Sequence, residues 1–134
     1  MKNLRKQLEE RIPTMEAAYK ETDRPQVDFS NYPEDLRANR KSEYDAIVLV
    51  EAARKIEREN NSEEIDWSNW NQYKWIPWFK MGGGSPAGFR FDGSCCDDTC
   101  ASAGSGSRLR VLNKETATYL GEKFLEVWEN VQLK

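Results

Sequence analysis

Three cysteines and two aspartates lie close together in a chain that has no histidine. Thiolates bind zinc well and a carboxylate can complete a tetrahedral site, so these residues form a candidate zinc site. Its ligands would be Cys95, Cys96 and Cys100 with Asp97 or Asp98. However, the spacing contains no C-x-x-C pair, and adjacent cysteines converge poorly on one ion. A metal-binding function is therefore an alternative, and we expect no resident metal or cofactor.

The same cysteines could also react. Nucleophilic catalysis by a cysteine normally needs a histidine or another positioned base, and the chain has no histidine. A disulfide between Cys100 and Cys95 or Cys96 would form only in an oxidising compartment, whereas an odd number of cysteines fits a reducing one. The sequence therefore favours a protein that is not an enzyme.

The cysteines belong to GSCCDDTCASAGSGS, a stretch of small and polar residues. We expect a long loop over residues 93–106. Long loops without secondary structure are uncommon in small domains and are usually functional or disordered. This loop is therefore the first candidate binding surface. Its candidate contact residues are Cys95, Cys96, Asp97, Asp98, Thr99 and Cys100.

Alternating residues on both sides of this loop predict strands in KWIPWFKM, GFRFD and SRLRVL. Successive side chains of a strand point to opposite faces, so one apolar set would face the core. That set is Trp75, Phe79, Phe89, Phe91, Leu109 and Val111. The outward set would then be basic with one indole, which suits single-stranded nucleic acid but is also ordinary for a wet sheet face. It consists of Lys74, Trp78, Lys80, Arg90, Arg108 and Arg110.

The chain as a whole is acidic, with a formal net charge of -3 and a pI near 5.2. This balance excludes a polycation that binds nucleic acid or membranes through its overall charge. Residues 74–111 contain five Lys or Arg and three Asp, whereas residues 34–66 contain six Lys or Arg and ten Asp or Glu. Any basic surface is therefore local to the predicted sheet.

The most distinctive motif is DWSNWNQYKWIPWF over residues 66–79. Trp67, Trp70 and Trp78 could form an aromatic platform for a sugar or a base. The same indoles could instead cover the core of a small domain that has few aliphatic residues, and we favour this interpretation.

Helices must position these segments. Apolar residues at helical spacing predict a helix over residues 1–20 that is interrupted at Pro13, followed by an extended connection over residues 21–41. A strong amphipathic helix is predicted over residues 42–60, with Ser42 as its N-cap. A second one follows Asn113, also a cap candidate, and Gly121 beside its apolar stripe would allow another element to approach closely.

The expected fold class is α+β, with a three-stranded antiparallel β-meander packed against two or more α-helices. Pro77 lies in the first strand, which should therefore be an edge strand or contain a bulge. We expect one core in residues 42–134, preceded by a helix and extended connection in residues 1–41. The N-terminal MKNLRKQLEERIPTM has no apolar h-region and no segment is long enough to span a membrane, so we expect a cytoplasmic protein.

Four motifs occur in a fixed order: W-x-N-x-x-Q-x-K-W-x-P-W-F, G-F-x-F, G-S-R-L and T-Y-L-G-E-K-F-L-E-V-W. This pattern resembles a family of small uncharacterised proteins of phages and prophages of gut Bacteroidales, and the resemblance covers residues 44–131. It implies a phage setting, with the segment between G-F-x-F and G-S-R-L as the most divergent part. No functional residue can be carried over. Arg110 stands where many relatives have Cys and Trp75 where Tyr is usual, which weakens a metal or redox role.

The leading hypothesis is therefore a non-enzymatic binding module of phage or prophage origin. It would contact a host or phage protein through the 93–106 loop and the adjoining basic sheet face, in the bacterial cytoplasm or in the virion. A single-stranded nucleic-acid-binding accessory protein is one alternative, and a Cys-based metal-binding protein is the other. The sequence predicts no membrane partner and does not specify an oligomeric state.

Overall fold

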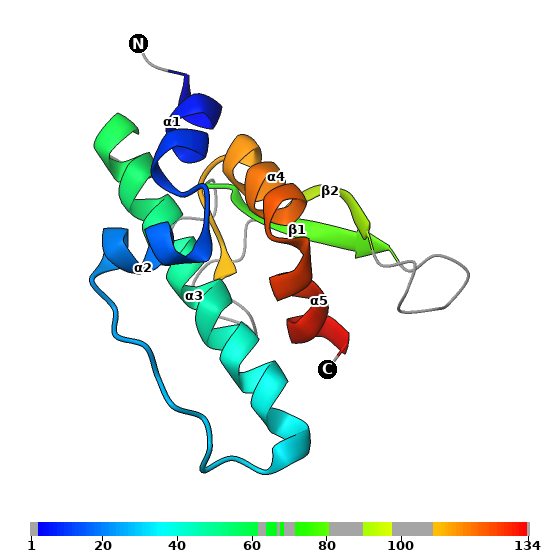
Figure 1. Ribbon diagram of the computed structural model, residues 1–134. Coiled ribbons are helices and arrows are strands. Elements are labelled where there is room, and N and C mark those ends of the chain that lie inside the picture. The colour runs from blue at the N-terminus through cyan, green and yellow to red at the C-terminus, as the bar shows by residue number, and fades with distance from the viewer. Residues whose placement is uncertain are drawn as a thin grey trace.

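The computed structural model describes residues 3–61, 64–66, 68, 72–80, 90–97 and 109–133. In this part of the chain there are five helices and one two-stranded antiparallel sheet (Figure 1). The expected three-stranded meander is wrong. Helices dominate the described residues, and the sheet that they contain has two strands. The fold is mostly helical.

The first two helices confirm the predicted helix with a break at Pro13. Helix α1 is Leu4–Arg11 and helix α2 is Met15–Thr22. Each has a side-chain cap at its start: Asn3 accepts first-turn backbone N–H groups of α1, and Thr14 accepts one of α2 at 3.2 Å. Because Thr14 directly follows Pro13 and caps a new helix, the chain forms two short helices instead of one.

Helix α3, Glu34–Asn61, begins eight residues before the predicted start at residue 42. Pro33 precedes the helix and the first turn is acidic, both of which favour a helix N-terminus. Ser42, the expected cap, is a buried residue inside the helix. The first two turns are mainly polar and exposed, so hydrophobic periodicity could not detect them. The expected division between residues 41 and 42 lies within α3.

The predicted C-terminal helix is two helices, α4 (Lys114–Lys123) and α5 (Leu125–Leu133). At the break, the Leu120 carbonyl accepts the Phe124 backbone N–H at 3.1 Å and the Trp128 indole N–H at 3.1 Å. The Leu120 carbonyl therefore keeps its helical partner and also accepts the Trp128 indole N–H, which ties α5 to the last turn of α4 across the break.

Strands β1 (Lys74–Lys80) and β2 (Arg90–Asp97) pair in antiparallel register. The register shifts between Trp78 and Phe79, next to Pro77, where the sequence predicted an irregularity. On its other side β1 forms a single bridge, from Trp75 to Val111, with N···O distances of 2.7 and 3.0 Å. The third predicted strand is thus reduced to one bridging residue in the described chain, and it pairs with β1 instead of β2.

Helix α3 is the longest element, and α1, α2 and α5 pack along it, whereas α4 lies against the β1–β2 sheet (Figure 1). One hydrophobic core joins these elements. It includes residues from α1 and α2, which precede the expected 41/42 division, and residues from α3, α4 and α5, which follow it. Its fully buried members include Leu8, Ile12, Ala18, Val48, Leu49, Ile56 and Ala117.

Candidate functional site

The structure places the first part of the predicted 93–106 loop in strand β2, which extends to Asp97. Cys96 pairs with Trp75, and Asp97 pairs with Lys74. A loop starting at residue 93 is therefore wrong: residues 93–97 belong to a strand although they are small or polar and do not alternate, so the sequence carried no strand signal there. The side chains of Cys95, Cys96 and Asp97, and all of Asp98, Thr99 and Cys100, lie outside the described residues.

The segment that remains between Asp97 and Val111 has both ends attached to neighbouring residues of β1. Asp97 pairs with Lys74 on one side of the strand, and Val111 bridges to Trp75 on the other side. Adjacent strands lie about 4.8 Å apart, so the two ends are separated by about two strand spacings. The base of this segment is thus set by β1.

Lys74 was expected on an outward basic face, but its side chain is fully buried. Its ammonium group donates a hydrogen bond to the Gln72 carbonyl at 3.0 Å. The expected exposure is wrong because a Lys stem can be buried when its charged end reaches a polar acceptor. Lys74 contributes to the structure where β1 begins and is not available at the surface.

Arg110 was also expected to point outward from the sheet, but its side chain is partly buried. Its carbonyl accepts a hydrogen bond from the Arg54 Nε at 2.6 Å, which joins this segment to α3. Val111 beside it is buried and Leu109 partly buried, as the sequence predicted. The basic set therefore does not form one continuous exposed face.

Lys80 and Arg90 are register partners at the end of the sheet opposite Lys74. Their side chains, that of Trp78 and the whole of Arg108 lie outside the described residues. The same holds for Trp67 and Trp70, so the suggested aromatic platform is not placed by the structure. Trp75 is partly buried and packs against the core.

Gln72 of the distinctive motif has a defined local role. Its side-chain oxygen accepts the Asp66 backbone N–H at 2.8 Å, and its amide nitrogen donates to the Glu64 carbonyl at 2.9 Å. Lys74 in turn bonds the Gln72 carbonyl. Gln72 and Lys74 therefore fix the backbone that leads into β1. Part of this motif is therefore explained by backbone hydrogen bonding, a role that the sequence analysis missed.

Glu57 is a fully buried carboxylate that the sequence analysis did not single out. It accepts the Leu112 and Asn113 backbone N–H groups at 2.9 and 2.8 Å, and the Asn113 side-chain amide at 2.9 Å. Burial raises its pKa above the usual value, and these hydrogen bonds oppose the rise. Asn113 occupies the N-cap position of α4 without a side-chain cap bond, and its side-chain NH₂ donates to Glu57. A signal was present: Glu57 lies at helical spacing from the buried Ala53 and Val50.

A second buried polar contact joins α2 to α3. The Tyr19 hydroxyl donates to Asp45, whose other oxygen accepts from the Lys41 ammonium at 3.2 Å. Burial and the bonded carboxylate raise the pKa of Tyr19, so the phenol stays protonated at neutral pH. This arrangement provides a structural hydrogen bond between the two helices.

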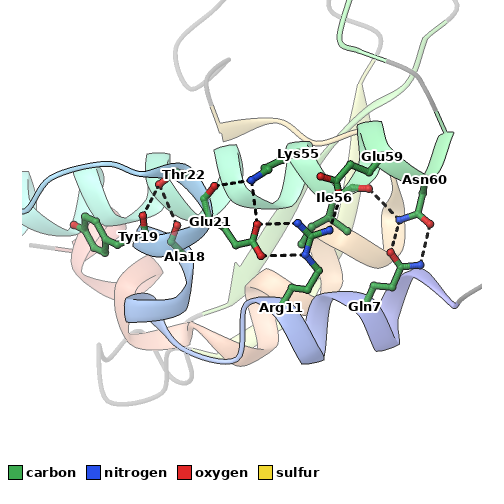
Figure 2. A network of polar contacts seen from close by, with 10 residues as sticks. All are labelled: Gln7, Arg11, Ala18, Tyr19, Glu21, Thr22, Lys55, Ile56, Glu59 and Asn60. Atoms are coloured by element: carbon green, nitrogen blue, oxygen red, sulfur yellow. Dashed lines mark hydrogen bonds and ion pairs between the residues drawn. The ribbon is translucent and has the colours of Figure 1, made fainter.

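Figure 2 shows a polar network that ties α1 and α2 to α3. The Arg11 guanidinium forms two hydrogen bonds with Glu21, at 2.8 and 3.0 Å, and one with Glu59. The Lys55 ammonium donates to the Glu21 carbonyl at 2.9 Å and lies 3.3 Å from its carboxylate. Arg11 lowers the pKa of Glu21, and likewise that of Glu59. The ionisable groups of this network hold helices together.

Two hollows on the described surface are similar in volume. One, of about 420 Å³, lies between α1 and α4, where the Arg5 guanidinium is 5.0 Å from the Tyr119 ring centroid. Arg5 there is already paired with Glu9 and Glu122. The other, of about 430 Å³, lies between the connection that follows α2 and the start of α3.

Comparisons with models of protein families, with curated proteins and with solved structures found no match. Among the described residues, no three His, Cys, Asp or Glu side chains are grouped as a metal site would require. The cysteines of the candidate zinc site are not among the side chains searched. None of the helices in the described ranges is long and apolar enough to cross a membrane.

Proposed function

We propose that this chain is a non-enzymatic binding module of phage or prophage origin, which contacts a host or phage protein through the segment between β2 and Val111. The observation that carries the proposal is the attachment of both ends of this segment to Lys74 and Trp75 of β1. A segment with a fixed base can vary in sequence with little effect on the core, which is how many scaffolds separate fold from recognition.

The rest of the structure supports a scaffold role for the helices. Buried Glu57 bonds the backbone that leads into α4, and buried Lys74 bonds the backbone that leads into β1. Both charges therefore strengthen the base from which the segment starts and to which it returns. The proposed location is the bacterial cytoplasm or the virion, which follows from the resemblance to phage proteins.

A second candidate function is binding of single-stranded nucleic acid. Lys80 and Arg90 are register partners, and like charges placed opposite each other in a sheet are destabilising. An anionic partner would offset that repulsion, and basic residues on a strand pair suit the phosphate backbone. This candidate places the contact at the end of the sheet that is opposite Lys74.

The test replaces residues 98–106 by a Gly-Ser sequence of the same length. Tagged protein is used for affinity capture from phage-infected or prophage-carrying Bacteroidales cells, with half of each lysate treated with nuclease. We expect wild-type protein to recover one protein partner with or without nuclease, and the variant to lose about tenfold or more of it, as removal of a central contact region does. Thermal unfolding should be unchanged.

The matched control replaces residues 82–86, the predicted turn at the opposite end of the strand pair, in the same way. It should retain the partner. Undiminished capture by the 98–106 variant would contradict the proposal. Recovery that disappears with nuclease would favour the second candidate, and substituting Lys80 and Arg90 by Gln should then weaken it and reduce its salt dependence.

A further inference from the structure

The C-terminal end of the proposed binding segment is held by two different elements. We call residues 110–113 the return end, because they lead from this segment into α4. Val111 bridges to Trp75 of β1 through two backbone hydrogen bonds, at 2.7 and 3.0 Å. The residues on either side of Val111 are bonded to side chains of α3. The return end is therefore tied to the sheet and to the longest helix at once.

Arg54 and Glu57 supply the bonds from α3. The Arg54 Nε donates to the Arg110 carbonyl at 2.6 Å. The two carboxylate oxygens of Glu57 have separate donors: Oε1 accepts the Leu112 N–H at 2.9 Å, and Oε2 accepts the Asn113 N–H at 2.8 Å. Residues three apart on a helix lie on the same face. One turn of α3 therefore holds the backbone along the whole return end.

The start of the proposed binding segment is attached differently. Asp97 is the last residue of β2 and the register partner of Lys74, so the segment leaves the sheet there. In the described part of the chain, β2 packs against β1 and α4. The start of the segment is thus set by strand pairing, whereas its return end is also set by side chains of α3. A substitution in α3 can therefore loosen one end of the segment and leave the strand pair intact.

The two α3 side chains are suited to holding a backbone in place. Glu57 is fully buried and Arg54 is partly buried. Hydrogen bonds that involve an ionised group are shorter and stronger than neutral ones, and a buried carboxylate favours the one backbone path that satisfies it. A binding segment whose end is already fixed loses less conformational freedom when a partner binds. Holding the return end should therefore strengthen binding.

We propose that Arg54 and Glu57 are positioning residues for the proposed binding segment: by fixing the backbone of residues 110–113, they set the place and direction in which the segment rejoins the core. This inference rests on the proposed function, because it requires the segment to contact a partner. It makes the affinity for that partner depend on one turn of α3, which acts through the backbone that it holds.

The first test needs no partner. Amide hydrogen exchange of the full chain is measured by NMR in wild type and in Arg54→Met, which keeps an apolar stem and has no donor. We expect the Val111 and Leu112 amides to exchange about tenfold faster, the scale of losing a hydrogen bond from a charged group. The amide of Val50 in α3 should keep its rate, because the change is local. Arg54→Lys should restore the wild-type rates, and Arg58→Met, the matched control one turn further along α3, should leave them unchanged.

Glu57→Gln is a second variant for the same measurement. It places one amide oxygen where two carboxylate oxygens accept the Leu112 and Asn113 N–H groups. At least one of these two amides should therefore exchange about tenfold faster. A purely structural role of either α3 residue would instead accelerate exchange throughout the core, the Val50 amide included.

The second test is affinity capture from nuclease-treated lysate of phage-infected Bacteroidales cells, at a temperature where circular dichroism shows every variant to be folded. Wild type, Arg54→Lys and Arg58→Met should recover equal amounts of the protein partner, and Arg54→Met about fivefold less. Wild type that recovers no partner would contradict the proposed function, and the exchange rates would still decide whether α3 holds the return end. The proposal is overturned if the return-end amides keep their rates in Arg54→Met and Glu57→Gln, if the Val50 amide accelerates equally, or if Arg54→Met captures as much partner as wild type.

Discussion

Two buried charged residues form hydrogen bonds with the backbone at the points where new elements begin. Glu57 bonds two N–H groups just before α4, and Lys74 bonds a carbonyl just before β1. A buried charge is costly unless it is hydrogen-bonded, so each residue restricts the chain to the one path that satisfies it. These residues specify how the elements connect.

We expect Glu57→Ala to lower the free energy of unfolding by about 2–4 kcal/mol, because it leaves buried N–H groups without an acceptor. Glu57→Gln should cost less, since an amide oxygen can still accept one bond. The measurement is urea denaturation from pH 4 to pH 8. The matched control, Glu10→Gln, removes an exposed carboxylate of α1 and should change little.

The pH dependence of wild-type stability gives a second readout of Glu57. The pKa of Glu57 is raised in the folded state from its usual 4.5, so the unfolded chain loses its proton first as pH rises. The stability contributed by this group is therefore full below pH 4.5 and declines as pH rises through the folded pKa. Both Glu57 variants should lack this decline. A decline of the same size in Glu57→Gln would assign it to another group.

At the scale of single residues, sequence patterns were of limited use for these two side chains. Glu57 lies at helical spacing from the apolar Ala53 and Val50, but the predicted stripe did not include it, and its burial was missed. Lys74 could not be predicted, because strand alternation assigns it to the outer face, whereas its ammonium group is buried and bonded to the Gln72 carbonyl. Local patterns indicate faces, but they do not show which acceptors a folded neighbour supplies.

At the scale of the elements, helix positions were predicted better than their ends or the pairing of strands. The break at Pro13 follows from a residue that cannot continue a helix. The early start of α3 depends instead on polar turns, and the apolar stripe that continues from α4 into α5 does not show the break at Phe124. Strand pairing is a non-local choice, so alternation alone could not show that Val111 pairs with β1.

The short helices α1 and α2 are held to α3 by the network around Arg11. We expect Arg11→Gln to lower the free energy of unfolding by about 1 kcal/mol at neutral pH, because the partners are partly exposed and the ion pairs are screened. Denaturation in low and high salt is the measurement. The matched control is Arg58→Gln. Arg58 pairs with Glu64, both side chains are exposed, and this ion pair should contribute little.

Acid should remove the difference between wild type and Arg11→Gln. The pKa values of Glu21 and Glu59 are lowered in the folded state by Arg11, so their stabilising effect is present above the usual 4.5 and is lost as pH falls through the folded values. A difference that persisted unchanged at low pH would mean that the Arg11 side chain acts by packing instead of by charge.

In the described part of the molecule, the N-terminal helices share a core with α3 and α4. Leu8 and Ile12 are fully buried, and the Tyr119 hydroxyl of α4 donates to the Ile12 carbonyl at 2.9 Å. Sequence periodicity correctly identified the apolar stripes of these helices. It could not show that the stripes meet in one core with α3 and α4, since the packing partners are far apart in the sequence.

Deletion of residues 1–22 should therefore abolish cooperative unfolding. Each fully buried Leu or Ile contributes about 1.5–3 kcal/mol, and the loss of several such residues together approaches the whole stability of about 5–15 kcal/mol of a small domain. The deletion would also remove Arg11 and Tyr19, leaving the buried Asp45 without its phenol partner. Thermal unfolding followed by near-UV circular dichroism is the measurement, with deletion of residues 1–3 as the control. A sharp transition near the wild-type temperature in residues 23–134 would show that α3, α4, α5 and the sheet form an independent core, and that α1 and α2 only dock onto it.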